Sequence, residues 1–356
     1  MAKEIKSALE EKKGVPEPES VNRSSIEKIK SKRHKQPTAK DLISDILKGN
    51  ITALSRAITI TESKNPSHLK KANTIINGCL PHANKSVRIG ITGVPGVGKS
   101  TFIEAFGSYL TSLGKKVAVL AVDPSSSLTK GSILGDKTRM EALVKDPNAF
   151  IRPSASGDSL GGVARKTRET IILCEAAGFD TILIETVGVG QSETAVHSMV
   201  DFFLLLKLAG AGDELQGIKR GIIEMADLIA INKADGENIK RAKLAKVEFN
   251  RALHLYPKKT SDWQPKVMLC SGINNEGIQP IWEEIQNYHS LTSKNGYFQE
   301  KRSEQNKFWL IQTIENHLKS NFFNNKEIKT ALTEQLQLIE DHKTTPFAAA
   351  DYLLSL

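Results

Sequence analysis

A glycine-rich loop between a strand and a helix is the feature that most constrains this chain. Residues 93–100 read GVPGVGKS and match the pattern G-x-x-x-x-G-K-[ST] at all four fixed positions. An apolar run at 87–91 precedes the loop, and a helical pattern begins at Thr101. Glycines let backbone N–H groups turn toward phosphate oxygens, and the start of the next helix adds partial positive charge. The alternative, a glycine-rich turn without a ligand, does not explain the full match.

The residues of this loop have separate expected roles. Lys99 is expected to reach the β- and γ-phosphates of a nucleotide as a catalytic charge, and the Ser100 hydroxyl to bind Mg²⁺. The predicted nucleotide contacts here are Gly93, Val94, Pro95, Gly96, Val97, Gly98, Lys99, Ser100 and Thr101.

A second motif, NKAD at 232–235, predicts which base is bound. It follows the apolar run 227–231, at the end of a predicted strand, where open α/β sheets bind ligands. The Asp235 carboxylate can accept two hydrogen bonds from guanine N1–H and N2–H₂, a donor pair that adenine lacks. Four letters alone are more typical of a polar loop, but downstream of a phosphate loop they indicate guanine recognition. Asn232 and Lys233 belong to this motif. Ser271, Gly272 and Ile273 follow the last predicted strand, at the place where GTPases use backbone N–H groups to contact guanine O6.

Three acidic residues are candidates for the metal and the chemistry. Asp123 ends an apolar strand, and a helix cap or turn is its alternative role. Asp136 lies in the stretch 130–139, which is punctuated by glycines and typical of a switch loop. It is a candidate metal ligand or water-orienting acid, and a plain exposed residue is the alternative. Glu185 stands where many GTPases have the Asp of D-x-x-G, and Gly188 stands at the glycine of that motif, whose N–H is expected to contact the γ-phosphate. A water-mediated contact can accommodate the extra methylene of Glu185.

Two further polar stretches are candidates for movement. In the stretch 188–193, Gln191 resembles a water-positioning glutamine but serves equally as a turn residue. The stretch 210–221 follows a buried strand, is rich in glycine, and suggests a partner-sensing loop through Asp213, Glu214, Gln216 and Lys219.

The alternation of apolar strands and helices from 87 to about 290 predicts an α/β, doubly wound, mostly parallel sheet. The predicted strands are 87–92, 117–122, 148–152, 180–186, 201–208, 227–232 and 266–270. The predicted helices are 99–113, 136–146, 161–177, 193–199, 215–225, 236–254 and 277–289.

The chain is expected to divide into four parts. A mobile basic leader covers 1–40, an N-terminal helical segment 41–85, the P-loop domain 86–292, and a C-terminal helical extension 293–356. In the helical segment, apolar residues between Leu42 and Ile58 recur at helical spacing, and a second helix covers 68–80. The apolar stripes of the C-terminal extension fit packing on the chain's own sheet or a dimer interface equally well.

Composition narrows the classes of protein. The net charge of +9 permits acidic partners without requiring them. Three separated cysteines, without ligand spacing, fit buried apolar groups in a reducing compartment. No run is long enough to span a membrane, and no secretory signal or transit peptide is recognised, so the expected compartment is the cytoplasm.

Together these motifs resemble the methylmalonyl-CoA mutase-associated GTPases, the MeaB/ArgK-like family, over roughly residues 41–356. The most specific segments are GITGVPGVGKST, AVDPSSS, GSILGDKTRM, ETVGVGQSE, GAGDELQGIKRGI and NKAD. Glu185 in place of Asp matches this family. The resemblance implies a homodimeric GTPase that binds GTP and GDP, chaperones an adenosylcobalamin-dependent acyl-CoA mutase, and gates its cofactor loading. It also implies that Mg²⁺ lies among Ser100, Asp123, Asp136 and Glu185, and that the loop 210–221 communicates with the mutase.

Two other functions stay open at this point. A P-loop kinase could transfer the γ-phosphate to a small molecule or a transport protein, although NKAD disfavours ATP. A non-enzymatic adaptor could reach nucleic acid through the basic run 28–35, although a solvated leader is the simpler interpretation and nucleic acid is not the expected partner.

Overall fold

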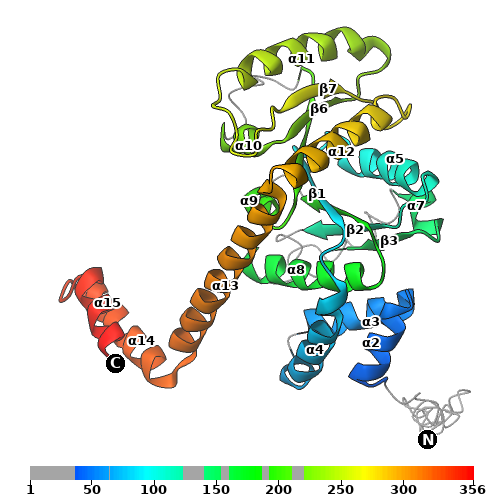
Figure 1. The fold of residues 1–356 in the computed structure, drawn as a ribbon. Helices are drawn as coiled ribbons and strands as arrows, with labels where there is room; N and C mark the ends of the chain where they lie inside the picture. Colours follow the sequence, from blue (N-terminus) through cyan, green and yellow to red (C-terminus); the bar gives the residue numbers. More distant parts are fainter. Residues whose placement is uncertain (1–36, 64, 123–139, 154–159, 187–191, 211–219) are drawn as a thin grey trace, which may run out of the picture.

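A seven-stranded parallel sheet forms the centre of the protein (Figure 1). The computed structural model describes residues 37–63, 65–122, 140–153, 160–186, 192–210 and 220–356. The strand order is β3-β2-β4-β1-β5-β6-β7, which confirms the predicted doubly wound sheet. The strands are β1 (Val87–Gly93), β2 (Val117–Val122), β3 (Ala149–Arg152), β4 (Thr181–Thr186), β5 (Phe202–Leu208), β6 (Leu228–Asn232) and β7 (Lys266–Leu269).

Helices cover both faces of this sheet, because its strands are apolar on both sides. One face packs against α5 (Lys99–Ser112), α7 (Glu141–Lys145) and α12 (Ile278–Lys294). The other packs against α8 (Leu160–Ala176), α9 (Ser192–His197), α10 (Arg220–Met225) and α11 (Ile239–Leu253), the last preceded by a 3-10 turn, η2 (Gly236–Asn238). Residues 136–139 of the helix predicted at 136–146 lie outside the described residues, and α7 begins only after Met140, which has a non-helical backbone.

The strand order places the phosphate loop at the middle of the sheet. β1 lies between β4 and β5, and the chain crosses from one side of β1 to the other between these two strands. Gly93 of β1 pairs with Leu206 of β5, while Ile91 pairs with Glu185 of β4. The loop therefore leaves β1 at a topological switch point, where ligands bind in such sheets.

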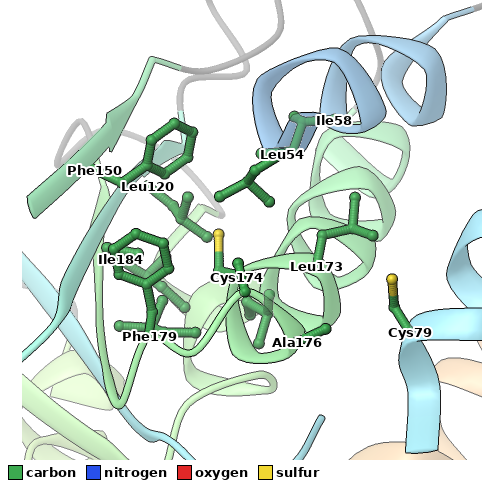
Figure 2. Packing of buried hydrophobic residues seen from close by; sticks show 14 of the residues in the cluster. Leu54, Ile58, Cys79, Leu120, Phe150, Leu173, Cys174, Ala176, Phe179 and Ile184 are labelled. Carbon is green, nitrogen blue, oxygen red and sulfur yellow. The ribbon is translucent and has the colours of Figure 1, made fainter. Parts of the chain in front are cut away.

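The N-terminal segment forms three helices, one more than the periodicity suggested. They are α2 (Ala39–Leu47), α3 (Ile51–Glu62) and α4 (Pro66–Cys79), and a 3-10 turn, η1 (Leu80–His82), follows. The predicted helix through Ile58 is broken because Gly49 takes a φ of +78° and the Asn50 side chain caps α3. Figure 2 shows Leu54 and Ile58 of α3 beside Leu173 and Cys174 of α8, so this segment is buried against the domain.

The C-terminal helices form an arm that extends from the domain (Figure 1). The arm comprises α13 (Tyr297–Asn324), α14 (Lys326–Glu340) and α15 (Pro346–Ser355), and Thr345 caps α15, since its Oγ1 accepts from the Ala348 N–H. Packing on the chain's own sheet does not account for the α13 stripe. In the single chain the stripe is exposed, at Phe308, Ile311, Ile314 and Leu318.

The root of α13 is held by one buried arginine. Arg302 donates to both carboxylate oxygens of Asp201, at 2.8 and 2.7 Å. It also donates to the carbonyl and side-chain oxygens of Asn84, at 3.0 and 2.9 Å, and to the Ser86 carbonyl oxygen, at 2.6 Å. Its five acceptors equal the five N–H donors of a guanidinium group. This side chain joins the arm to the start of β5 and to the segment that enters β1.

No helix in the described part of the chain combines the length and apolar character needed to cross a bilayer.

Candidate functional site

Two glycines of the phosphate loop have no room for a side chain. A Cβ atom on Gly93 would lie 2.6 Å from the Leu206 carbonyl oxygen of β5. Gly98 has a φ of +92°, and a Cβ atom there would lie 2.8 Å from the Asn232 amide nitrogen. The loop therefore lies directly against β5 and the NKAD segment, which fixes the shape of its backbone.

The loop lysine lies over the loop itself. Lys99 opens α5, is buried, and donates from Nζ to the carbonyl oxygens of Gly93 and Val94, at 2.8 and 3.3 Å. Ser100 is half-buried and Thr101 exposed in the first turn of the same helix. These groups surround the N-terminus of α5, a position whose backbone N–H groups and dipole favour anions.

The NKAD segment is hydrogen-bonded to the phosphate loop. Asn232 Nδ2 donates to the Val97 carbonyl oxygen at 2.9 Å, and Lys233 Nζ donates to the Gly96 carbonyl oxygen at 2.9 Å. Lys233 has a φ of +56°, a conformation that costs a residue with a side chain about 1 kcal/mol or more. The two motifs thus form one continuous wall at the carboxyl ends of β1 and β6.

The segment after β7 completes this wall. Ser271 Oγ donates to the Asp235 carboxylate, and the Gly272 N–H donates to Asn232 Oδ1 at 3.3 Å. Ser271 and Glu276 exchange two backbone hydrogen bonds, at 2.9 and 3.1 Å, which close a short hairpin. The exposed Ile273 lies in this hairpin. The Asp235 carboxylate is consequently oriented by a neighbour that is itself held in place.

Glu185 lies at the carboxyl end of β4, where it is buried and in register with Ile91 of β1 and Ala121 of β2. The next residue, Thr186, donates from Oγ1 to Thr92 Oγ1 at 2.8 Å, which ties the end of β4 to the end of β1. Carboxylate and hydroxyl oxygens are the donors that Mg²⁺ prefers, so Glu185 and Ser100 fit this ion chemically. Among the described residues no three His, Cys, Asp or Glu side chains are grouped as a metal site.

Comparison with known proteins decides the family. The model of the methylmalonyl-CoA mutase-associated GTPases, MeaB, matches residues 54–327. The chain belongs to this family. It is a GTPase, an enzyme that hydrolyses GTP to GDP and phosphate.

Relatives of this GTPase cover most of its length. A protein of Mycobacterium tuberculosis strain H37Rv, named a probable GTPase, is 45% identical over 91% of this chain and 96% of its own. The mouse protein named methylmalonic aciduria type A homolog, mitochondrial, is 42% identical over 88% of this chain and 78% of its own. A crystal structure described as LAO/AO transport system kinase is 36% identical and covers 90% of this chain and 98% of its own, with a TM-score of 0.74.

Several predicted site residues of this GTPase lie outside the described part of the chain. These are the catalytic and metal candidates Asp123 and Asp136, the γ-phosphate contact Gly188 with its neighbour Gln191, the basic run 28–35, and the partner-sensing residues Asp213, Glu214, Gln216 and Lys219. Their roles remain predictions.

Sequence patterns did not reveal several contacts that shape the site. The Thr92–Thr186 pair joins two strand ends, and its only sequence signal is a hydroxyl residue at the end of each buried strand. Cys270 Sγ lies 3.6 Å from Asn232 Oδ1, and burial raises the pKa of this thiol to about 12. A neutral thiol therefore packs behind the NKAD segment, as expected for a buried apolar group.

Proposed function

We propose that this GTPase is a chaperone for an adenosylcobalamin-dependent acyl-CoA mutase of the methylmalonyl-CoA mutase type, gating cofactor loading and protecting the mutase from inactivation. The observation that carries the proposal is the wall formed by Asn232, Asp235 and Ser271 against the phosphate loop, in a chain of the mutase-associated family. A guanine-specific site in a protein of that family fits a chaperone that acts on the mutase in a GTP-dependent way.

In this proposal guanine is selected by the Asp235 carboxylate. Guanine N1–H and N2–H₂ would both donate to it, whereas adenine offers no such donor pair and would leave a partly buried carboxylate with unpaired acceptor sites, which costs free energy. The hydrogen bond from Ser271 would hold the carboxylate in position before the base arrives.

The chain's own groups would carry phosphoryl transfer by positioning and charge. Lys99 would move its hydrogen bonds from the loop carbonyls to the β- and γ-phosphates. Ser100 and Glu185, with Asp123 and Asp136, would hold Mg²⁺, which neutralises phosphate charge when bound. Water would attack the γ-phosphorus as the bond from the β–γ bridging oxygen breaks, yielding GDP and phosphate, and the water proton would pass to solvent. No arginine finger is assigned, so we expect slow turnover without a partner.

We also propose that the arm joins two copies of the chain into a homodimer, because its apolar stripe on α13 is exposed in the single chain. The loop 210–221 would sense the mutase. The three cysteines are buried free thiols, which fits the cytoplasm as a reducing compartment.

Mutase protection tests the proposal directly. A purified adenosylcobalamin-loaded mutase from the same organism would be followed through turnover with GTP, with and without this protein. We expect slower inactivation with the wild-type chain and no protection with Lys99→Ala. Equal inactivation in all three reactions would contradict the proposal.

A kinase is the second candidate, favoured by the resemblance to the structure described as a transport system kinase. The two functions differ in their product. Phosphate released to water supports the GTPase chaperone, whereas a stoichiometrically phosphorylated acceptor would support the kinase.

A further inference from the structure

Helix α11 presents an outward surface that combines positive charge with exposed aliphatic side chains. We call it the α11 face, and we define it by the exposed residues Lys240, Arg241, Lys243, Leu244, Val247, Glu248 and Arg251 of α11 and His254, Leu255 and Lys258 just after it. Glu248 is the one acid in this set. Residues three or four apart on a helix are neighbours, so Lys240, Leu244, Val247 and Arg251 form one continuous stripe.

The fold does not explain these cations. The opposite side of α11 packs against the sheet through Ala242, Ala245 and Phe249, which lie in a buried cluster with strands β5 to β7. Within the described residues, none of the five cations of the α11 face forms an ion pair with an acid. Lys240 and Lys243 are three residues apart on the helix, a spacing at which like charges are slightly destabilising.

Exposed aliphatic groups lie among the cations. Leu244 is 67% exposed, Val247 47% and Leu255 87%. Beside them lies a hollow of about 180 Å³, lined by Asn250, Leu253, His254, Gln264, Pro265 and Lys266. Apolar groups within a polar rim, next to a hollow, are typical of a protein interface. The α11 face has no exposed Phe, Tyr or Trp, although base stacking on single-stranded nucleic acid relies on aromatic groups.

The α11 face adjoins the functional site. Helix α11 follows the NKAD motif after the single turn η2. The side chain of Arg241 lies beside Gly210, which ends the described part before the proposed partner-sensing loop, with its Cδ 3.9 Å from a Cβ placed on that glycine. In Figure 1, α11 lies at the end of the molecule opposite to α2, α3 and α4.

We propose that the α11 face is a docking surface for an acidic, partly aliphatic surface of the mutase. This inference rests on the proposed function and extends it, since it assigns the surface that recognises the client. Acidic side chains of the client would face Lys240, Lys243 and Arg251, while an aliphatic group would cover Leu244 and Val247. The cations would raise the rate at which the mutase associates with this protein and make that rate salt-dependent. The aliphatic contact would set the lifetime of the complex.

Stimulation of GTP hydrolysis by increasing mutase tests this surface. The charge variant is Lys240→Gln/Lys243→Gln/Arg251→Gln, and the aliphatic variant is Leu244→Ser/Val247→Ser. Electrostatic steering raises association rates by roughly 10-fold or more, so we expect the charge variant to need about 10-fold more mutase for half-maximal stimulation at low salt. That difference should shrink as salt is raised, whereas the aliphatic variant should be weakened at every salt concentration.

A matched control removes the same number of charges elsewhere. Lys40→Gln/Lys48→Gln/Lys70→Gln changes three exposed lysines on or next to α2 and α4, and it should respond to the mutase like the wild type. Basal GTP hydrolysis should be equal in all four proteins, which verifies folding.

The outcomes separate this inference from the proposed function. If the mutase stimulates the wild type and both α11 variants equally, the docking surface is wrong and the proposed function stands. If the mutase neither binds nor stimulates the wild type, the proposed function fails and the inference falls with it. If the α11 variants instead change the oligomeric mass, or lose binding to duplex DNA while keeping mutase stimulation, the face serves another copy or nucleic acid, and the proposal is overturned.

Discussion

At the scale of single residues, the proposed base selection depends on one carboxylate whose orientation is fixed in advance. Asp235 accepts a hydrogen bond from Ser271, and Asn232 ties the same segment to the phosphate loop. Preorganised groups of this kind lose less free energy on binding than groups that must first be ordered.

Replacing Asp235 by Asn removes the negative charge and replaces one acceptor oxygen by an NH₂ group, which would face a guanine donor. Hydrogen bonds to a charged group contribute about 1.5–3 kcal/mol each, so we expect GTP affinity to fall at least 100-fold. Equilibrium titration with a fluorescent GTP analogue measures this loss. The control Glu237→Gln changes an exposed carboxylate two residues away and should bind normally. Unchanged affinity in Asp235→Asn would refute the assignment of the base.

Replacing Lys99 by Ala removes the cation that neutralises the transferred phosphate. Loss of one such donor typically costs 10²–10³ in rate, so phosphate release should fall by about that factor. The control is Lys116→Ala, which changes an exposed lysine just before β2. Equal melting temperatures would show that both variants fold. Full activity in Lys99→Ala would disprove its catalytic role.

At the residue scale, the sequence predicted the motif residues but not the contacts between them. The motif residues Lys99, Asn232 and Asp235 could be named from spacing, because each motif is contiguous in the chain. The contact between Lys233 and Gly96, and that between Thr186 and Thr92, join residues far apart in sequence, and no single-sequence pattern encodes them.

At the scale of elements, periodicity predicted the strands well and the helix ends less well. All seven strands agree to within one residue at each end, because buried parallel strands are short apolar runs between polar loops. The break between α2 and α3 was missed because apolar spacing continues across it, while Gly49 and Asn50 end one helix and begin the next.

Arg302 connects helix α13 to the domain, and its contribution to the free energy of unfolding can be measured. Arg302→Lys keeps the charge but supplies fewer donors in a different geometry, which leaves buried acceptors unpaired. We expect the free energy of unfolding to fall by about 2–3 kcal/mol in urea titrations. Lys307→Gln, exposed on the next turn of α13, should change it by less than about 0.5 kcal/mol. If both variants have the same stability, Arg302 does not hold the arm in place.

At the scale of the whole molecule, the arm and the sheet differ in how their apolar surfaces are covered. The sheet is buried on both faces within one chain, whereas the arm exposes an apolar stripe along α13. The described residues do not cover that stripe, and the sequence could not distinguish between the chain's own sheet and a second copy as its partner.

A charged substitution in the stripe tests the proposed homodimer. Light scattering should give about twice the chain mass of 39.1 kDa for the wild type. Ile314→Asp/Leu318→Asp should give the single-chain mass, because burying two unpaired carboxylates at an interface is costly. The control Asn316→Asp/Ser320→Asp adds the same charge to polar positions of α13 and should remain dimeric. A wild-type monomer would contradict the role proposed for the arm.

The central claim is that a guanine-specific hydrolase responds to its mutase. Its most direct test is steady-state phosphate release from GTP, with ATP as the control nucleotide, in the presence and absence of a purified cobalamin-dependent acyl-CoA mutase from the same organism. Our account predicts hydrolysis of GTP but not ATP, at a rate that rises when the mutase is added. A preference for ATP, or a GTP hydrolysis rate that the mutase leaves unchanged, would contradict it.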